Sequence, residues 1–348
     1  MSSLIVTVQK IEEIKEHTNA DALELAIIGG WQCVIKKGSM PAGQLCVYFP
    51  IDSILPVELS DIIGVTGYLS KGKVKAVRLR GEPSYGLLWS VDAMLKAMKE
   101  HPEIIKKDDY VSIQNYTEGT DVAELFGITK WEPPMQFATG GASNEHPSFF
   151  RYTGIENMRN FMNIITEGEE VVISEKIHGS NSRFSYVDGE YIAGSHYQQK
   201  IEDYANLYWA LFTDNYKDLL KELSSRGIPI IYSEIYGKQD LKYGLINGAI
   251  DIVSYDISIN GLYLDYDEIK DLFNSYDIIM PPELYRGPFS MDIVKGLEGP
   301  SKVAGANNIM EGVVIKPVHE RYDPKLRRVI LKYLFNQYLT RKGGSEFK

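Results

Sequence analysis

The chain has 348 residues, which is enough for two domains that each bury a hydrophobic core. Hydrophobic residues make up 44% of the chain and charged residues 24%, and no apolar run approaches the roughly 20 residues that cross a bilayer. The first residues lack the basic stretch and apolar core of a secretory signal. The net charge of −10 excludes a protein coated in basic surface, although a local basic groove remains compatible with it. We therefore expect a soluble, cytoplasmic protein of two domains.

The first 130 residues alternate short apolar runs with turn signals. The runs have the spacing of strands in a small β-barrel or sandwich, and they cover residues 4–8, 23–28, 33–38, 44–51, 74–81 and 85–91. Cys33 and Cys46 lie inside these runs, and neither has a second cysteine or a histidine at metal-ligand spacing, so we expect buried thiols. A helix is expected over residues 93–99.

Residues 131–147 hold three prolines and two adjacent glycines without apolar periodicity, which predicts an interdomain linker. Longer elements follow it, with a helix expected over residues 203–224. Strands are expected over residues 170–175, 191–194, 229–234, 249–257, 312–316 and 329–333. These elements predict an α+β second domain over residues 148–342, followed by a disordered tail over residues 343–348.

The strongest chemical signal is the sequence from Glu175 to Gly179, in which Lys176 ends a buried strand. A lysine in that position can be desolvated and surrounded by other cations, so that its neutral amine attacks phosphorus. Gly179 would let the backbone turn tightly beside a nucleotide. Taken alone, a lysine three residues before a glycine is more often a solvated lysine in a turn, so the surrounding motifs must decide between the two interpretations.

Three further segments of the second domain carry charged residues on strands. Glu234 ends one strand, Glu311 and Lys316 stand at the two ends of a β-branched strand, and Lys332 lies in the last strand. Between them, Tyr255 supplies an aromatic ring that could stack on a base or serve as a core residue.

In this order the motifs resemble the covalent nucleotidyltransferase superfamily of RNA ligases, DNA ligases and mRNA capping enzymes. The spelling Glu-Lys-Ile-His-Gly-Ser-Asn over residues 175–181 is closer to RNA ligases than to DNA ligases. The first 130 residues resemble the oligonucleotide-binding (OB-like) domain of the manganese-dependent RNA ligases of the Naegleria type. The resemblance implies an N-terminal OB-like β-barrel, followed by a nucleotidyltransferase domain of antiparallel sheets with flanking helices, in a monomer.

The resemblance also implies a reaction and its residues. Lys176 would attack the α-phosphorus of ATP and expel pyrophosphate; the adenylate would pass to an RNA 5′-phosphate, and a 3′-hydroxyl would displace AMP. The implied catalytic residues are Lys176, Glu234, Glu311 and Lys332. The implied nucleotide-binding residues are Glu175, Ile177, Gly179, Asn181, Tyr255, Lys316 and Lys332. A Mn²⁺ or Mg²⁺ ion would be held by Glu311 and by His178 through water, with a structural role as the alternative for His178.

Two positions depart from the family pattern. Where many relatives have Ser-Arg after a strand, this chain has Ser195-His196, so His196 either replaces an arginine or is a surface histidine. The last motif, often Lys-x-Lys, here reads Lys332-Tyr333-Leu334. The second cation would then come from Arg328 or Lys316, unless the role is missing.

Candidate RNA contacts lie in two stretches. Lys71, Lys73 and Lys75 would line one face of a strand, with Arg78 and Arg80 close behind, and a solvated strand face is the alternative. The aromatic and basic stretch that contains Arg151 and Arg159 could contact RNA or pack between domains.

The sequence therefore predicts an ATP-dependent RNA ligase that joins 5′-phosphate and 3′-hydroxyl ends. An mRNA guanylyltransferase is one alternative, but only about 16 residues follow Lys332, which leaves no room for the domain that usually follows in capping enzymes. An RNA-binding protein with an inactive ligase domain is another, against which the intact motif residues argue.

Overall fold

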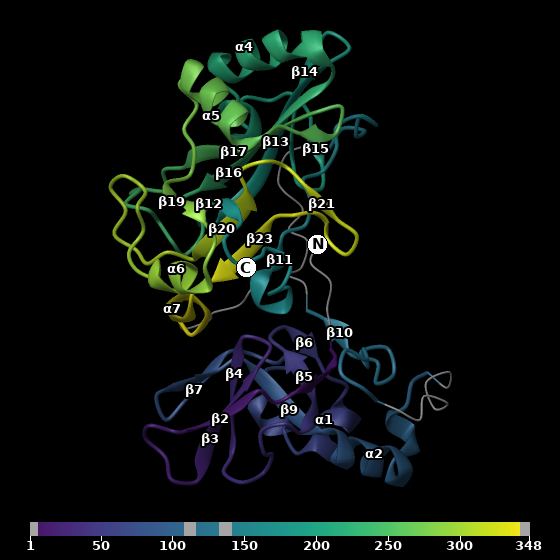
Figure 1. The fold of residues 1–348 in the computed structure, drawn as a ribbon. Coiled ribbons are helices and arrows are strands. Elements are labelled where there is room, and N and C mark those ends of the chain that lie inside the picture. The colour runs from purple at the N-terminus through teal and green to yellow at the C-terminus, as the bar shows by residue number, and fades with distance from the viewer. Residues whose placement is uncertain (1–5, 108–115, 132–140, 342–348) are drawn as a thin grey trace. The chain divides into compact units, whose positions relative to one another are not determined.

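The computed structural model describes residues 6–107, 116–131 and 141–341 (Figure 1). The expected linker at residues 131–147 lies mostly outside these ranges, and the expected tail at residues 343–348 lies entirely outside them. The chain divides into a first unit, residues 2–135 with 336–348, and a second unit, residues 136–335 with residue 1. No helix of the described residues is long and apolar enough to span a membrane.

The first unit consists mainly of short antiparallel strands. They are β1 (Val8–Lys10), β2 (Glu13–Glu16), β3 (Leu23–Ile28), β4 (Trp31–Lys36), β5 (Leu45–Pro50), β6 (Ser53–Ile54), β7 (Val77–Leu79), β8 (Glu82–Ser84), β9 (Gly86–Ser90) and β10 (Thr129–Lys130). They form the sheets β1-β5-β9 and β2-β3-β4 and the pairs β7-β8 and β6-β10. The predicted architecture of short strands is confirmed, but the hydrogen bonds of the described strands do not close a single barrel.

The helices of the first unit are short, and its core is continuous. They are α1 (Val57–Ile63), α2 (Val91–Glu100), α7 (Asn336–Leu339), η1 (Thr66–Tyr68) and η2 (Pro102–Ile104). Val47, Phe49 and Trp89 of the β1-β5-β9 sheet pack in one hydrophobic cluster with α1 and α2. Cys33 and Cys46 are buried thiols, as the sequence predicted.

The second unit contains two antiparallel sheets. Its strands are β11 (Glu156–Asn157), β12 (Glu170–Lys176), β13 (Gly179–Val187), β14 (Glu190–Ser195), β15 (Gln199–Lys200), β16 (Pro229–Tyr236), β17 (Asp251–Ile259), β18 (Leu262–Tyr263), β19 (Glu283–Pro288), β20 (Gly312–Pro317), β21 (Tyr322–Asp323), β22 (Arg327–Arg328) and β23 (Leu331–Leu334). One sheet has the order β11-β23-β20-β12-β19 and the other β15-β14-β13-β16-β17-β18. Only the β11–β23 pair in these sheets is parallel among the described strands. All six strands predicted from the sequence of this unit are present.

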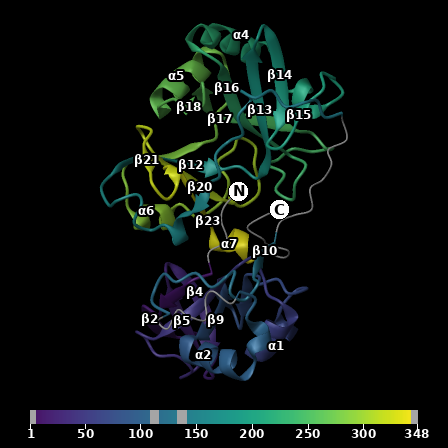
Figure 2. The ribbon, with the colours of Figure 1, turned by 90° about the vertical axis from the view of Figure 1, so that its right-hand side faces the viewer.

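Helices α3 (Leu207–Ala210), α4 (Asp214–Leu223), α5 (Tyr266–Ser275) and α6 (Met291–Gly296), with η4 (Met158–Asn160) and η5 (Ser224–Arg226), complete the second unit. Helices α4 and α5 cover one face of the six-stranded sheet (Figure 2). Leu219 of α4 and Phe273 of α5 pack there against Phe184 and Ile231 of the sheet.

The single helix expected over residues 203–224 is wrong, because the chain forms α3 and α4 instead. Asn206 and Thr213 precede the two helices with extended backbones, and both residue types favour the position before a helix. The Asn206 side chain accepts a hydrogen bond from the Tyr208 N–H. The break places Phe212 between the helices, where its ring stacks on Phe184 at 4.6 Å between centroids.

The two sheets of the second unit are joined at the sequence motif that contains Lys176. Only Ile177 and His178 separate β12 of one sheet from β13 of the other. Strand β12 lies beside β20, and β13 lies beside β16. The ends of four strands therefore meet where the sequence predicts the reactive lysine.

Candidate active site

Lys176 and Glu311 meet because their strands are paired. Lys176, the last residue of β12, lies opposite Gly312, the first residue of β20, so that Glu311 stands just before the paired position. The Lys176 Nζ lies 3.0 Å from Glu311 Oε2. The Lys176 side chain is 24% exposed and that of Glu311 3%. This arrangement brings together two of the predicted catalytic residues from positions 135 residues apart.

Glu311 is a buried carboxylate that is ionised at neutral pH. Burial alone would raise the pKa of Glu311. The charge of Lys176 and the contact with His178 outweigh this effect and lower the pKa to about 2. His178 Nδ1 lies 3.4 Å from Glu311 Oε2, and Nε2 lies 2.8 Å from Asp240 Oδ1. Asp240 was not singled out in the sequence, since it stands in a loop without a motif.

Glu234 contributes a second carboxyl group, whose pKa is raised where that of Glu311 is lowered. It lies on β16 opposite Asn181 of β13. Burial raises the pKa of Glu234 to about 8. The positive charge of Lys176 opposes this increase, and the negative charge of Glu311 adds to it. At neutral pH this carboxyl group is therefore mostly protonated, in contrast to Glu311.

The two motif glycines are required by close approach of neighbouring strands. A Cβ on Gly179 would lie 2.4 Å from the carbonyl oxygen of Ile235 and 2.8 Å from Cγ of Glu234. A Cβ on Gly312 would lie 2.2 Å from the carbonyl oxygen of Tyr333. The expected tight turn at Gly179 is not found. The position needs a glycine because it begins strand β13, which lies close to β16.

The backbone around Lys176 is held from both sides by loops. The Glu175 carboxylate accepts hydrogen bonds from Ser301 Oγ (2.6 Å) and from the Lys302 N–H (2.7 Å). The His178 N–H donates to the hydroxyl of Tyr243 at 2.6 Å. Tyr243 is 2% exposed and has a left-handed backbone with φ of 51°, a costly conformation for a bulky residue.

These contacts revise two of the predicted nucleotide-binding residues. The Glu175 carboxylate is 1% exposed and bonded to the loop at residues 301–302, so it positions the neighbouring Lys176 rather than facing solvent. Ile177 is 4% exposed and packed in the interior. Tyr243, a supporting residue that the sequence did not indicate, belongs to the same arrangement.

Asn181 and Tyr255 contact each other at the edge of the site. The Asn181 amide donates a hydrogen bond to the Tyr255 hydroxyl at 2.6 Å. The Tyr255 ring is half-buried, with the ring of Tyr152 at 5.0 Å in an edge-on arrangement. Tyr255 is thus fixed by both a polar and an aromatic neighbour, so one ring edge is already occupied by protein.

Lys332 shares a sheet face with Lys176. It lies opposite Val314 of β20, which in turn lies opposite Ser174 of β12. Directly opposed residues point to the same face, and Ser174 and Lys176 are two residues apart. The Lys332 side chain is 7% exposed. The structure therefore places Lys332 on the same sheet face as Lys176, two strands from β12.

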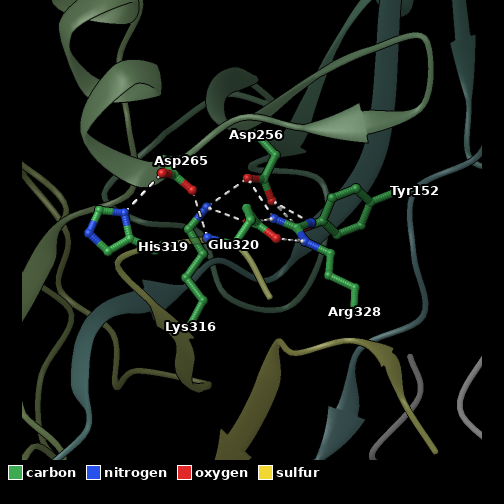
Figure 3. A network of polar contacts seen from close by, with 7 residues as sticks. All are labelled: Tyr152, Asp256, Asp265, Lys316, His319, Glu320 and Arg328. Carbon is green, nitrogen blue, oxygen red and sulfur yellow. Dashed lines mark hydrogen bonds and ion pairs between the residues drawn. The ribbon is translucent and has the colours of Figure 1, made fainter. Parts of the chain in front are cut away.

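Lys316 and Arg328, the candidate second cations, are both bound to other side chains. Lys316 Nζ donates to Asp256 Oδ1 at 2.7 Å, and Arg328 donates to both oxygens of Asp256 at 3.0 Å. Figure 3 shows these residues converging with Glu320 and Tyr152 on one buried network. Lys316 lies opposite Val172, four residues or about 13 Å along β12 from Lys176. The expectation that Lys316 or Arg328 covers the nucleotide phosphate is therefore not met by this arrangement.

His196 is half-buried and differs in charge from the arginine that many relatives have at this position. Burial, together with the positive charges of Arg183 and Arg151, lowers its pKa to about 4, so its ring is neutral at pH 7. The cation beneath this position is Arg183, whose side chain is fully buried and donates to the Ser195 carbonyl oxygen at 2.8 Å. Arg183 was not singled out in the sequence.

The predicted strand of RNA-binding lysines in the first unit is wrong. Lys71 has a left-handed backbone with φ of 56°, and the chain turns at Gly72. Lys73 is buried, with Nζ 2.5 Å from Asp52 and 3.3 Å from the centre of the Trp131 ring. Lys73 thus stabilises the interior of the unit.

The other predicted RNA contacts differ in exposure. Lys71, Lys75, Arg78 and Arg80 are exposed on the first unit. In the second unit Arg151 is exposed, whereas Arg159 is 5% exposed and donates to the Leu334 carbonyl oxygen at 3.2 Å. Arg159 is therefore a structural residue, and the exposed five remain candidates.

The site offers partial coordination for a divalent cation. Among the described residues no three His, Cys, Asp or Glu side chains converge as a complete metal cage. Glu311, ionised and beside His178, supplies a hard oxygen, which suits Mg²⁺ or Mn²⁺ because these ions keep several waters and substrate phosphates as ligands. The donor set therefore fits an ion held by Glu311, by His178 and by the nucleotide.

Comparisons with known proteins agree with this geometry. Residues 169–334 match the family model described as RNA ligase, and residues 5–91 match one described as an OB-fold domain. The comparison with curated proteins finds no match.

Similar solved structures come from the RNA ligase of Naegleria gruberi. The ligase with PPi is 25% identical with a TM-score of 0.75, covering 97% of this chain and 98% of that chain. A lysine-to-methionine mutant with AMP and Mn is 25% identical with a TM-score of 0.76, covering 98% and 99%. A lysine-to-alanine mutant with ATP and Mn is 24% identical with a TM-score of 0.77, covering 98% and 99%. Residues 169–334 of the second unit are therefore similar to the RNA ligase family, and a segment similar to an OB-fold domain precedes them at residues 5–91.

Proposed function

We propose that this chain is an ATP-dependent RNA ligase that joins 5′-phosphate and 3′-hydroxyl ends through a lysyl-AMP intermediate on Lys176. The observation that carries the proposal is the meeting of Lys176 with Glu311 and Glu234 at the junction of the two sheets, inside the segment that matches the RNA ligase family. The similar Naegleria ligase structures, which contain ATP, AMP, PPi and Mn, support ATP as the nucleotide and a divalent metal as the cofactor.

In the first step the Lys176 nitrogen forms a bond to the α-phosphorus of ATP, and the bond from that phosphorus to the pyrophosphate oxygen breaks. The ion pair with Glu311 holds the Lys176 amine in place but keeps it protonated. Attack requires that the amine lose a proton. Glu234, with a pKa of about 8, has the affinity of a general base that works near neutral pH, once its carboxyl group is ionised.

The two later steps transfer the adenylate. An oxygen of the RNA 5′-phosphate forms a bond to the AMP phosphorus while the lysine–phosphorus bond breaks. The 3′-hydroxyl oxygen then attacks the 5′-phosphorus, and AMP leaves. Lys332, on the same sheet face as Lys176, would offset negative charge on the transferring phosphate. A divalent ion held by Glu311 and His178 would supply further charge neutralisation when bound.

The first unit would hold the RNA substrate. Its exposed cations Lys71, Lys75, Arg78 and Arg80 can contact a phosphate backbone without base specificity. A monomer is the simplest working form, since one chain carries both the segment similar to an OB-fold domain and the segment similar to RNA ligases.

The deciding experiment is incubation of the protein with [α-³²P]ATP and Mn²⁺ in the absence of RNA, followed by denaturing electrophoresis. A radioactive band at the mass of the chain supports lysine adenylylation. Labelling by [α-³²P]GTP instead would support guanylyl transfer, and the absence of a labelled band with either nucleotide would count against an active enzyme.

Glu311→Gln is expected to reduce adenylylation by about a thousandfold. The change keeps the shape of the side chain but removes the charge that pairs with Lys176 and that fits a divalent ion. Single-turnover labelling over a range of Mn²⁺ concentrations measures the effect. The matched control is Glu298→Gln, which neutralises an acid outside this site; wild-type rates for Glu311→Gln would contradict the assignment.

Neutralising Lys71, Lys75, Arg78 and Arg80 together is expected to weaken RNA binding and flatten its salt dependence. Each phosphate contact on a single strand contributes about 0.7 to the slope of log affinity against log salt. If all four residues contact phosphates, the magnitude of the slope should therefore fall by about 3. Fluorescence anisotropy with a 5′-phosphorylated RNA measures it. Neutralising the exposed Lys10, Lys15, Lys36 and Lys37 is the control, and an equal change in both variants would argue for a general charge effect.

A further inference from the structure

A second group of chemically distinctive residues lies at the end of β14 and does not include Lys176 or Glu311. Residues 195–198 connect β14 to β15, and we call them the aromatic loop because they include His196 and Tyr197. We infer that the aromatic loop and Arg151 form a stacking surface for the single-stranded end of the RNA. This inference rests on the proposed function and adds an RNA-binding surface on the ligase domain itself.

The aromatic loop is held rigidly. The Ser195 N–H donates to the Gln198 carbonyl oxygen at 2.9 Å, and the Gln198 N–H donates to Ser195 Oγ at 3.1 Å. From below, the fully buried Arg183 donates from Nε to the Ser195 carbonyl oxygen at 2.8 Å and from a terminal nitrogen to the Phe149 carbonyl oxygen. A side chain on this loop is therefore presented at little cost in conformational entropy on binding.

The ring that the loop presents is that of Tyr197. It is 41% exposed, although a tyrosine ring can bury a large apolar surface. The ring of His196 stands nearly perpendicular to it, at 4.7 Å between centroids and 87° between planes. The Arg151 guanidinium lies 5.8 Å from the centre of the Tyr197 ring and donates to the Tyr197 carbonyl oxygen at 3.3 Å.

The ion pairs in contact with the aromatic loop carry a positive charge, in contrast to the net charge of −10 on the chain. Arg151 and Arg183 are both paired with Glu145, which leaves one positive charge in excess. Lys200, two residues beyond the loop, is buried and donates a hydrogen bond to Gln198 Oε1 at 2.9 Å. The neutral His196 contributes an aromatic face but no charge. An anionic partner is therefore favoured here.

A partner that combines negative charge with flat rings is a single-stranded nucleic acid. Bases stack on exposed aromatic side chains, and arginine contacts the adjacent phosphates. The loop also lies near the reactive residues, because Ser195 is opposite Ser182, the neighbour of Asn181, and Asn181 is opposite Glu234. Adjacent strands are about 4.8 Å apart, so a base on Tyr197 would place the next nucleotides within reach of Glu234.

The test uses the full chain and a 5′-phosphorylated single-stranded RNA that carries 2-aminopurine in place of its end adenines. Without ATP, Tyr197→Ala is expected to weaken binding about tenfold, within the range for loss of one base–aromatic stack. Tyr197→Phe should bind within about twofold of wild type, since it keeps the ring. Stacking should quench 2-aminopurine emission in the wild type and in Tyr197→Phe but not in Tyr197→Ala. Arg151→Gln should lower the salt slope by about 0.7.

Tyr322→Ala is the matched control, because Tyr322 is a 58% exposed tyrosine on β21 of the same unit. It should bind RNA as the wild type does. Wild-type affinity and quenching in Tyr197→Ala, or equal losses in Tyr197→Phe and Tyr197→Ala, would overturn the stacking surface. Labelling of the wild-type protein with [α-³²P]ATP is measured in parallel, so that failure of the proposed ligase activity is distinguished from failure of this surface.

Discussion

Replacement of Lys176 by alanine will abolish transfer of label from [α-³²P]ATP to the chain, because Lys176 supplies the amine that lies beside Glu311 at the end of β12. The loss should be complete in a denaturing gel, since a covalent intermediate cannot form without its nucleophile. His178 still contacts Glu311 in this variant, so we expect the fold to persist with a loss of about 1–3 kcal/mol in unfolding free energy.

Lys176→Arg should be equally inactive, because a guanidinium group stays protonated and cannot attack phosphorus. This variant keeps the positive charge beside Glu311, so it separates the need for a nucleophile from the need for a cation. Thermal unfolding of all three proteins checks that inactivity does not come from misfolding. Wild-type labelling in either variant would remove Lys176 from the role proposed for it.

The motif strands could be predicted from the sequence because their signals are local. Buried β-branched runs with a charged residue at one end predicted strands at residues 170–175, 229–234 and 312–316, and β12, β16 and β20 extend these only by one or two residues. The meeting of Lys176 with Glu311 followed from the order of motifs in a known family rather than from either strand alone.

Period-two spacing was misleading where a turn interrupts it. Lys71, Lys73 and Lys75 alternate in sequence, but Lys71 and Gly72 both adopt positive φ, so the chain reverses within the supposed strand. Lys73 then points inward to Asp52. Sequence spacing alone does not reveal such a turn, because lysine rarely adopts this backbone conformation.

Long-range ion pairs were equally inaccessible to the sequence. Asp256 binds Lys316 from 60 residues away and Arg328 from 72 residues away, so neither partner could be recognised by spacing. The same holds for the contact of Tyr243 with His178 over 65 residues. For this reason the motif order suggested that Lys316 or Arg328 contacts the nucleotide phosphate, whereas both residues bind Asp256.

Replacement of Asp256 by alanine will destabilise the second unit by about 3–5 kcal/mol, a large share of the stability of an ordinary domain. The side chain is 1% exposed, and its removal would leave Lys316 and Arg328 buried with Glu320 as their shared acid (Figure 3). Hydrogen exchange of β17 and β20 peptides, read by mass spectrometry under denaturant, measures the second unit separately. The control is Asp267→Ala, which breaks an exposed pair with Arg286 and should cost less than about 1 kcal/mol.

The pH dependence of the Asp256 effect has a definite sign. Burial alone would raise the pKa of Asp256. The charges of Arg328 and Lys316 outweigh this effect and lower the pKa from 3.8 to about 2. Because the folded-state pKa is depressed, this stabilisation is fully present above pH 3.8 and is lost as the pH falls through 2. Asp256→Asn has no such titration, so the stability difference between wild type and Asp256→Asn should shrink by on the order of 2 kcal/mol between pH 5 and pH 2. A difference that stays constant over this range would show that Asp256 is not held ionised by the two cations.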